Sequence, residues 1–218
     1  MDGDLRLWDG GARTQGVIFD LFETLIDYDE DRSREFTTAA ADLLGRDREE
    51  FHGLWRKGRE VRDSGPLAPY VASLGLADDL AEQLLELRRA TARRLLVPRS
   101  GVVETLRVLR QRGLKVGLIT VCSEDTVDVW SESPFAGLFD VEIFSCSVQL
   151  RKPDPRIYLL ACHELGIEPA DAIFVGDGAN DELAGAERAG MRAVMIGGAI
   201  EAWPGARISA IPEVLDLL

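Results

Sequence analysis

The sequence predicts an α/β protein in which a doubly wound parallel sheet carries an inserted all-helical subdomain. Five short runs are rich in Val, Ile, Phe and Leu without alternating polar residues, as expected of parallel strands covered on both faces. Helical patterns separate the later runs. A long segment after the first run contains helical patterns only. The predicted strands span residues 17–19, 114–119, 141–144, 172–175 and 193–196.

Each of the three helical patterns between the later strands ends at a glycine. They begin near residues 102, 157 and 183, and their apolar positions recur at helical spacing. A glycine just beyond the last apolar residue is typical of a helix C-terminus. The strands and helices together predict a Rossmann-like core made of residues 1–27 and 98–218. The three terminating glycines are Gly113, Gly166 and Gly190.

Residues 28–97 predict a second, all-helical subdomain. Segments near 31–44 and 48–62 have helical patterns, and an apolar stripe at helical spacing follows them. A structureless loop of this length is improbable inside a compact fold, so we expect packed helices here. The stripe consists of Leu80, Leu84, Leu87, Thr91 and Leu95.

The charge balance excludes some partners. The chain has 38 Asp and Glu against 25 Lys and Arg, a formal net charge of −13. Nucleic acids and anionic membranes are held by clustered cations, so we expect neither as a partner. A phosphate ligand would require local features that overcome this repulsive field.

We expect a cytoplasmic location from the N-terminal residues and the cysteines. The first eleven residues lack the basic and apolar regions of a signal peptide, and no apolar run reaches 18 residues. Cys122, Cys146 and Cys162 are odd in number and lack zinc-site spacing, which favours reduced thiols.

Polar residues follow four of the predicted strands, where ligands bind in open α/β sheets. The segments are DLFET (20–24), ITVCS (119–123), RKPDP (151–155) and GDGAND (176–181). One Asp after a strand is uninformative because Asp is a common helix N-cap. The ordered set of Asp, Thr, Lys and paired Asp after four strands is a far more specific indication of an active site than any one of these residues.

These four motifs, at these separations, resemble the motifs of the haloacid dehalogenase (HAD) superfamily. The resemblance covers nearly the whole chain. The insert at residues 28–97 lies where members of subfamily I carry a helical cap. The resemblance therefore implies a hydrolase whose reaction takes place at the strand ends, beneath a cap.

The resemblance also implies roles for single residues. Asp20 would attack phosphorus and form a covalent aspartyl-phosphate. Lys152 would screen the charges of the nucleophile and the phosphate, and Thr120 would donate its hydroxyl to a phosphoryl oxygen. Asp181 is assigned to catalysis as well, although an N-cap of the following helix is an open alternative.

A magnesium site is implied at the same strand ends. Its ligands would be Asp20, Asp177 and the backbone carbonyl of Phe22. Neighbouring carboxylates stay ionised together only if a cation lies among them, and oxygen ligands suit Mg²⁺. The residues assigned to substrate binding are Phe22, Thr24, Val121 and Lys152.

Phe22 departs from the pattern of the family's phosphatases. They usually carry a second Asp at this position, which protonates the leaving group and then deprotonates the attacking water. Such acid–base assistance is typically worth about 10²–10⁴ in rate. Glu23, a cap residue, the substrate, or a leaving group that needs no proton are the open alternatives.

The family's haloacid dehalogenases have an aromatic residue at the position of Phe22. The spacing from Lys152 to Tyr158 also resembles theirs. Asp177 argues against this reading, since those metal-independent enzymes carry a small neutral residue there. Their cap also supplies a halide-binding arginine, for which Arg32, Arg34 and Arg56 are candidates without the expected helix signature.

The function predicted from the sequence is therefore a Mg²⁺-dependent phosphatase acting on a small phosphorylated metabolite. The alternatives are a metal-independent 2-haloacid dehalogenase-like hydrolase and a weakly active or non-catalytic relative that binds a phosphorylated ligand. The sequence leaves the oligomeric state open.

Overall fold

The computed structural model describes residues 14–28, 30–197 and 203–218. It contains a parallel sheet of six strands in the order β3-β2-β1-β4-β5-β6. All five predicted strands are confirmed to within one residue at each end. The strands are β1 (Gly16–Phe19), β2 (Lys115–Thr120), β3 (Val141–Phe144), β4 (Ala172–Gly176), β5 (Arg192–Ile196) and β6 (Ala206–Ile208).

The strand β6 was not predicted. It has three residues, pairs with β5 alone at the sheet edge, and buries only Ile208 fully. An edge strand this short has no continuous apolar run, so the pattern that identified the other five does not apply to it.

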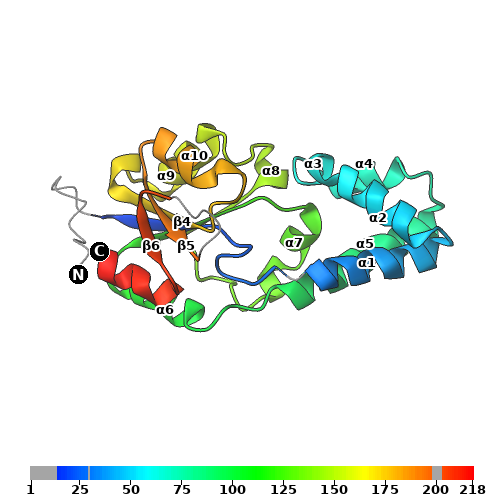
Figure 1. Ribbon diagram of the computed structural model, residues 1–218, viewed down its shortest axis with the longest axis horizontal. Helices are drawn as coiled ribbons and strands as arrows, with labels where there is room; N and C mark the ends of the chain where they lie inside the picture. Colours follow the sequence, from blue (N-terminus) through cyan, green and yellow to red (C-terminus); the bar gives the residue numbers. More distant parts are fainter. Residues whose placement is uncertain (1–13, 29, 198–202) are drawn as a thin grey trace.

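Helices cover both faces of the sheet, which confirms the predicted fold class (Figure 1). The helix α6 (Val102–Gln111) and the 3₁₀ helix η4 (Ile211–Leu217) cover one face, and α9 (Pro155–Leu165) and α10 (Glu182–Arg188) cover the other. Val17 and Phe19 pack into the first hydrophobic cluster, whereas Ile18 packs into the second. Burial on both faces explains why the strand sequences do not alternate.

Shorter elements connect the strands. These are α7 (Glu124–Asp128), η1 (Trp130–Glu132), α8 (Ser145–Val148), η2 (Pro169–Asp171) and η3 (Ala179–Asp181).

Five helices lie in the described part of residues 28–97, which leaves out residue 29, and we call this group the cap. They have a hydrophobic cluster of their own, which includes Phe36, Trp55 and Leu84. The helical pattern expected over 48–62 is interrupted at Gly58, where α2 ends and α3 begins. The cap helices are α1 (Glu30–Leu44), α2 (Arg48–Lys57), α3 (Arg59–Arg62), α4 (Leu67–Ala72) and α5 (Asp78–Leu95).

The two ends of the cap segment lie side by side. Ile26 forms an antiparallel bridge with Pro98, and the Arg99 amide donates to the Leu25 carbonyl at 2.8 Å. The chain therefore leaves and re-enters the core at one place. The exact boundaries at 28 and 97 remain predictions.

Polar contacts join the cap to the core at α7 and α8 (Figure 1). The Leu67 amide donates to Glu124 at 2.9 Å, and Arg88 forms a 2.7 Å ion pair with Asp125. The Ser145 hydroxyl donates to the Asp63 carbonyl at 2.6 Å. The cap thus rests directly on the edge of the core where the strands end.

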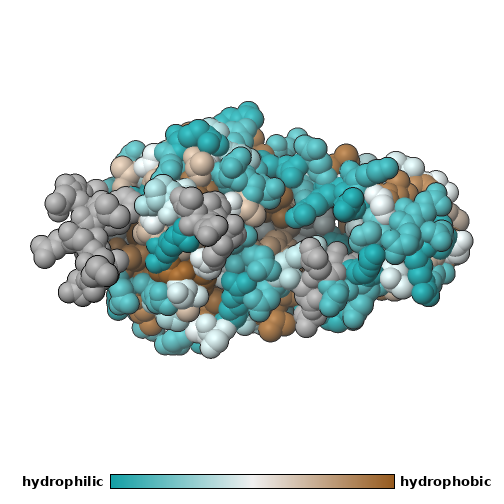
Figure 2. All heavy atoms as spheres, in the orientation of Figure 1, coloured by the Kyte–Doolittle hydropathy of each residue, from teal (hydrophilic) through white to brown (hydrophobic). Residues whose placement is uncertain are grey.

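The face shown in Figure 2 is largely hydrophilic, with hydrophobic residues in scattered patches. Within the described ranges, no helix combines the length and the apolar character that crossing a membrane requires.

Candidate active site

The strand ends place the predicted site residues at one edge of the sheet. In register, Phe19 lies beside Leu118 of β2 and Val175 of β4, so the residues that follow these positions emerge together. Asp20 follows β1 directly, and its amide donates to the Val175 carbonyl at 2.9 Å. The residue is only 5% exposed.

Lys152 lies between two carboxylates. Its ammonium donates to Asp20 Oδ1 and, at 2.5 Å, to Glu182 Oε2. All three residues are buried. Burial works against the charged ammonium, but the negative charges of Asp20 and Glu182 outweigh it and raise the pKa of Lys152. Lys152 therefore remains a cation beside Asp20.

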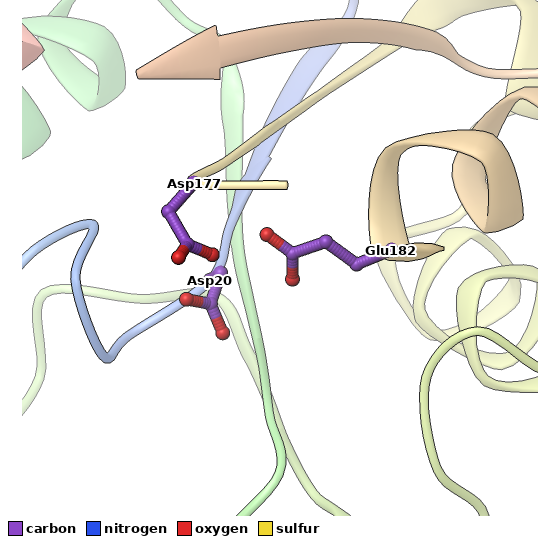
Figure 3. A group of neighbouring side chains, drawn as sticks. All are labelled: Asp20, Asp177 and Glu182. Atoms are coloured by element: carbon purple, nitrogen blue, oxygen red, sulfur yellow. The ribbon is translucent and has the colours of Figure 1, made fainter. Parts of the chain in front are cut away.

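Three carboxylates converge at this place (Figure 3), and two of them are the groups that contact Lys152. Asp20, Asp177 and Glu182 each place one oxygen within 4.8 Å of the other two. Burial is the main cause of a raised pKa at Asp20, and it raises the pKa of Glu182 to about 8. The Lys152 charge opposes both shifts.

This donor set fits a hard divalent cation. All three groups are carboxylates, and the single lysine leaves their combined negative charge only partly balanced when they are ionised. Oxygen ligands of this kind are those that Mg²⁺ prefers.

Besides Asp20, the carboxylate that contacts Lys152 is that of Glu182, whereas Asp181 lies elsewhere. Asp181 is exposed, caps no helix N–H with its side chain, and lies outside the group of three carboxylates. Asn180 and Asp181 both have positive φ, and this turn delivers Glu182, the first residue of α10, to the buried site. The Glu182 carboxylate also accepts from the Gly178 amide at 3.0 Å.

Glu182 could not be identified as a site residue from the sequence, because a glutamate at the start of a helix is common without such a role. A glutamate in the first turn of a helix is usually a favourable partner for the helix dipole, without further role. Tyr158, noted for its spacing from Lys152, donates its hydroxyl to the Glu182 carbonyl at 2.7 Å and so supports this turn.

Two predicted hydroxyls are buried without partners. The Oγ1 atoms of Thr24 and Thr120 find no hydrogen-bond partner among the residues that the structure describes. Thr120 ends β2 and is fully buried. An unpaired buried hydroxyl is costly, so these atoms are suited to receive a ligand oxygen.

Glu23 does not point toward the cluster of carboxylates. Its carboxylate accepts from the Tyr28 amide at 2.5 Å and from Arg99 at 3.1 Å, and it is absent from the group that includes Asp20. The φ of 58° at Glu23 accompanies this turn. The contacts argue against Glu23 as the missing acid.

A cavity of about 560 Å³ lies between the cap and the core. Phe22 and Val121 line its wall, as do Arg34 and Arg56 of the cap. The Arg32 side chain is outside the described part of the structure. Asp20 does not line the cavity, but Phe22, two residues after Asp20, and Val121, which follows Thr120, do, so the cavity adjoins the strand-end site.

A family model described as haloacid dehalogenase-like hydrolase matches residues 14–190. The chain belongs to this HAD-like family. The match spans all four strand-end motifs and the cap, and the helical-cap type predicted from the sequence is confirmed.

Phosphatases are among the similar proteins. Phosphoglycolate phosphatase 1 of Pseudomonas aeruginosa is 34% identical over 187 residues, which cover 81% of this chain and 66% of that protein. Two other curated phosphatases match over about half their length, 44% and 51%.

Solved structures share the fold. A HAD phosphatase from Thermococcus onnurineus superimposes with a TM-score of 0.71 at 25% identity, covering 93% of this chain and 97% of that one. A 2-haloacid dehalogenase from Pseudomonas syringae pv. Tomato gives 0.68 at 22% identity, with the same coverage, which supports the shared fold alone.

Proposed function

We propose that this HAD-family protein is a Mg²⁺-dependent phosphatase that acts on a small phosphorylated metabolite. The observation that carries the proposal is Asp177, whose carboxylate lies beside that of Asp20 at the strand ends (Figure 3). A metal-independent dehalogenase has no need of this second carboxylate. The curated relatives named phosphatases support the same reading.

Asp20 is the proposed nucleophile. Its attack forms a bond between a carboxylate oxygen and phosphorus while the bond from phosphorus to the leaving oxygen breaks. Water then cleaves the aspartyl-phosphate and releases inorganic phosphate. Lys152 contacts Oδ1 of Asp20, which leaves Oδ2 free to attack and orients the carboxylate.

The remaining residues stabilise charge on the transferring group. Thr120 donates its unpaired hydroxyl to a phosphoryl oxygen, and Lys152 supplies a buried positive charge. Asp20, Asp177 and the Phe22 carbonyl would hold Mg²⁺, which neutralises phosphoryl charge when bound. Glu182 holds Lys152 in place by its 2.5 Å contact, and we assign this positioning role to Glu182; the catalytic role expected for Asp181 stays a prediction.

Phe22 favours a second candidate, a 2-haloacid dehalogenase-like hydrolase. A phenyl ring cannot protonate a leaving group, and a departing halide needs no proton. A third possibility, a relative that binds a phosphorylated ligand without turnover, remains among the outcomes of the test.

One panel of assays separates these functions. We expect phosphate release from p-nitrophenyl phosphate that needs Mg²⁺, stops with EDTA, and is eliminated in Asp20→Asn. Halide release from a 2-haloacid without metal would establish the dehalogenase instead. Ligand-dependent thermal stabilisation without turnover of either class would indicate a binding protein.

The expected cytoplasmic location stays part of this proposal. Cys122, Cys146 and Cys162 are buried free thiols, which supports a reducing compartment.

A further inference from the structure

We propose that Arg62 and Arg88 of the cap bind a second anionic group of the substrate, so that preferred substrates carry a carboxylate or phosphate besides the phosphoryl group that is transferred. The inference rests on the proposed phosphatase function, because it concerns the other end of the same substrate. Neither arginine belongs to the four strand-end motifs.

Among the side chains that the structure describes, the lining of the cavity between cap and core has a positive excess, with five arginines and three aspartates. The whole chain carries a formal net charge of −13, so this concentration of cations reverses the global balance locally. A cationic cleft with low-dielectric walls raises the local concentration of anions. The charged residues are Arg34, Arg56, Arg59, Arg62 and Arg88, with Asp31, Asp63 and Asp125.

Arg62 is a buried cation without a carboxylate in contact. The residue is 5% exposed, and no Asp or Glu in the described part of the chain forms an ion pair with it. Its guanidinium donates to the Trp55 carbonyl at 2.6 Å, and Asp63, its neighbour in sequence, pairs with Arg59. Burial lowers the pKa of Arg62, which reflects the cost of keeping this charge out of water.

Aromatic rings contact both guanidiniums, and the two share the Trp55 ring. Arg62 lies 4.0 Å from the centre of the Trp55 ring and Arg88 lies 5.7 Å from it. Tyr70 contacts the first guanidinium and Phe36 the second, at 5.0 and 4.7 Å. Rings of this kind stabilise a cation through their faces, and Tyr70 is also a hydrogen-bond partner of Arg62; neither interaction neutralises the guanidinium charge.

Arg88 keeps spare donor capacity although it is paired. One terminal nitrogen contacts Asp125 at 2.7 Å, but the buried Nε has no acceptor among the described residues. Arg88 also lowers the pKa of Arg62 by repulsion, which places two like charges near each other. An anion bound between them would relieve this repulsion and receive planar, charge-assisted hydrogen bonds.

Arg62 and Arg88 lie where the part of a small substrate that is not transferred would bind. The same cavity wall includes Phe22 and Val121, each adjacent in sequence or nearly so to the proposed catalytic residues Asp20 and Thr120. A phosphoryl group at the strand ends would therefore leave the remainder of the molecule in the cavity. A carboxylate or phosphate on that remainder matches the arginines, whereas a neutral tail does not.

The experiment compares matched substrates in Mg²⁺. The carboxylate arm uses 2-phosphoglycolate against ethyl phosphate, and the phosphate arm uses propane-1,3-diol bisphosphate against propyl phosphate. We expect kcat/KM to be higher for the anionic member of at least one pair, and the arm that shows it identifies the tail.

In Arg62→Met the preferred anionic substrate should lose about 10- to 100-fold in kcat/KM, as expected when one charge-assisted contact is removed. The neutral partner should change little, and Arg62→Lys should retain part of the preference. Arg88→Met should behave like Arg62→Met. Arg107→Met, which removes an exposed charge on α6, is the matched control and should leave both substrates unchanged.

The proposal would be overturned if Arg62→Met lowered kcat/KM equally for anionic and neutral substrates. It would also be overturned if the wild-type protein showed no preference for the anionic substrates. Binding measured by calorimetry with phosphonoacetate and ethylphosphonate separates this failure from failure of the proposed function. If phosphonoacetate binds more tightly than ethylphosphonate, and Arg62→Met abolishes this difference, the result supports the anion site even without turnover. Phosphatase activity with equal binding of both phosphonates supports the function and rejects the site.

Discussion

At the scale of single residues, the site combines a buried ion network with an aromatic side chain at the position where the resemblance in sequence leads us to expect an acid. Lys152 contacts Asp20 and Glu182, and the three are buried together. Phe22 lines the neighbouring cavity, and its ring meets Tyr28 edge-on at 6.2 Å. The site therefore contains a cation, Lys152, that stabilises negative charge, but the Phe22 side chain has no proton to donate.

Replacing Phe22 by Asp tests whether the missing acid limits the rate. Alkyl alcohols are poor leaving groups, so Phe22→Asp should accelerate hydrolysis of alkyl phosphates by up to about 10²-fold and of aryl phosphates much less. The comparison uses kcat/KM for ethyl phosphate and p-nitrophenyl phosphate, with Phe22→Leu as the control. Unchanged rates for both would show that the proton comes from elsewhere.

Glu182 predicts a pH dependence of stability. Its pKa is about 8 in the folded protein, against an ordinary value near 4.5, because burial disfavours the charged form. Between these values the folded state holds a proton that the unfolded state has released. The free energy of unfolding must therefore fall as pH rises through this window.

We expect the Tm of the metal-free protein in EDTA to fall between pH 5 and pH 8. The slope should be shallower in Glu182→Gln, where this proton is absent. Parallel Tm profiles for the two proteins would contradict the assignment.

At the scale of elements, the close packing of α10 against its neighbours determines where Glu182 lies in the site. Gly185 of α10 faces Pro153 and Tyr158, and an added Cβ would lie 2.8 Å from the Pro153 carbonyl oxygen and from the Tyr158 hydroxyl. That hydroxyl bonds to the Glu182 backbone. The approach of α10 thus places Glu182 beside Lys152.

Gly185→Ala should destabilise the protein by about 1–3 kcal/mol, because the extra methyl forces α10 away from its neighbours. Gly53 in α2 is the matched control, since an added Cβ there meets nothing within 4 Å. Gly53→Ala should stabilise by about 0.5–1 kcal/mol through helix propensity. Denaturant unfolding measures both, and equal signs for the two variants would refute this account.

At the scale of the whole molecule, a few polar contacts hold the cap against the core and thereby enclose the cavity. Ser145 of α8 is fully buried and is the most deeply placed of these contacts. Its hydroxyl donates to the Asp63 carbonyl in the cap and accepts from the Cys122 amide at 3.1 Å. One side chain therefore joins the cap, α8 and the loop after β2.

Ser145→Ala should cost about 1–3 kcal/mol of unfolding free energy, since the Cys122 amide and the Asp63 carbonyl both lose their partner. Ser147→Ala is the control, because Ser147 is exposed on the same short helix. Chemical denaturation of both variants is the measurement. A loss of similar size in Ser147→Ala would show that the effect is not due to the buried bridge.

Local sequence patterns predicted the core fold, the helical cap and four site residues, which are Asp20, Thr120, Lys152 and Asp177. These depend on local information, since buried strands and amphipathic helices have characteristic patterns and parallel strands bring their carboxyl ends to one edge. The short edge strand β6 lacks such a pattern.

The contact of Glu182 with Lys152 and the exposure of Asp181 emerge from the folded structure, because the turn with positive φ at Asn180 and Asp181 turns Glu182 into the site. The tertiary structure also decided that Arg62 and Arg88 share one aromatic ring, although they are 26 positions apart on separate helices. Both features depend on where backbone turns and helix packing place a side chain, and residue type and spacing do not encode this locally.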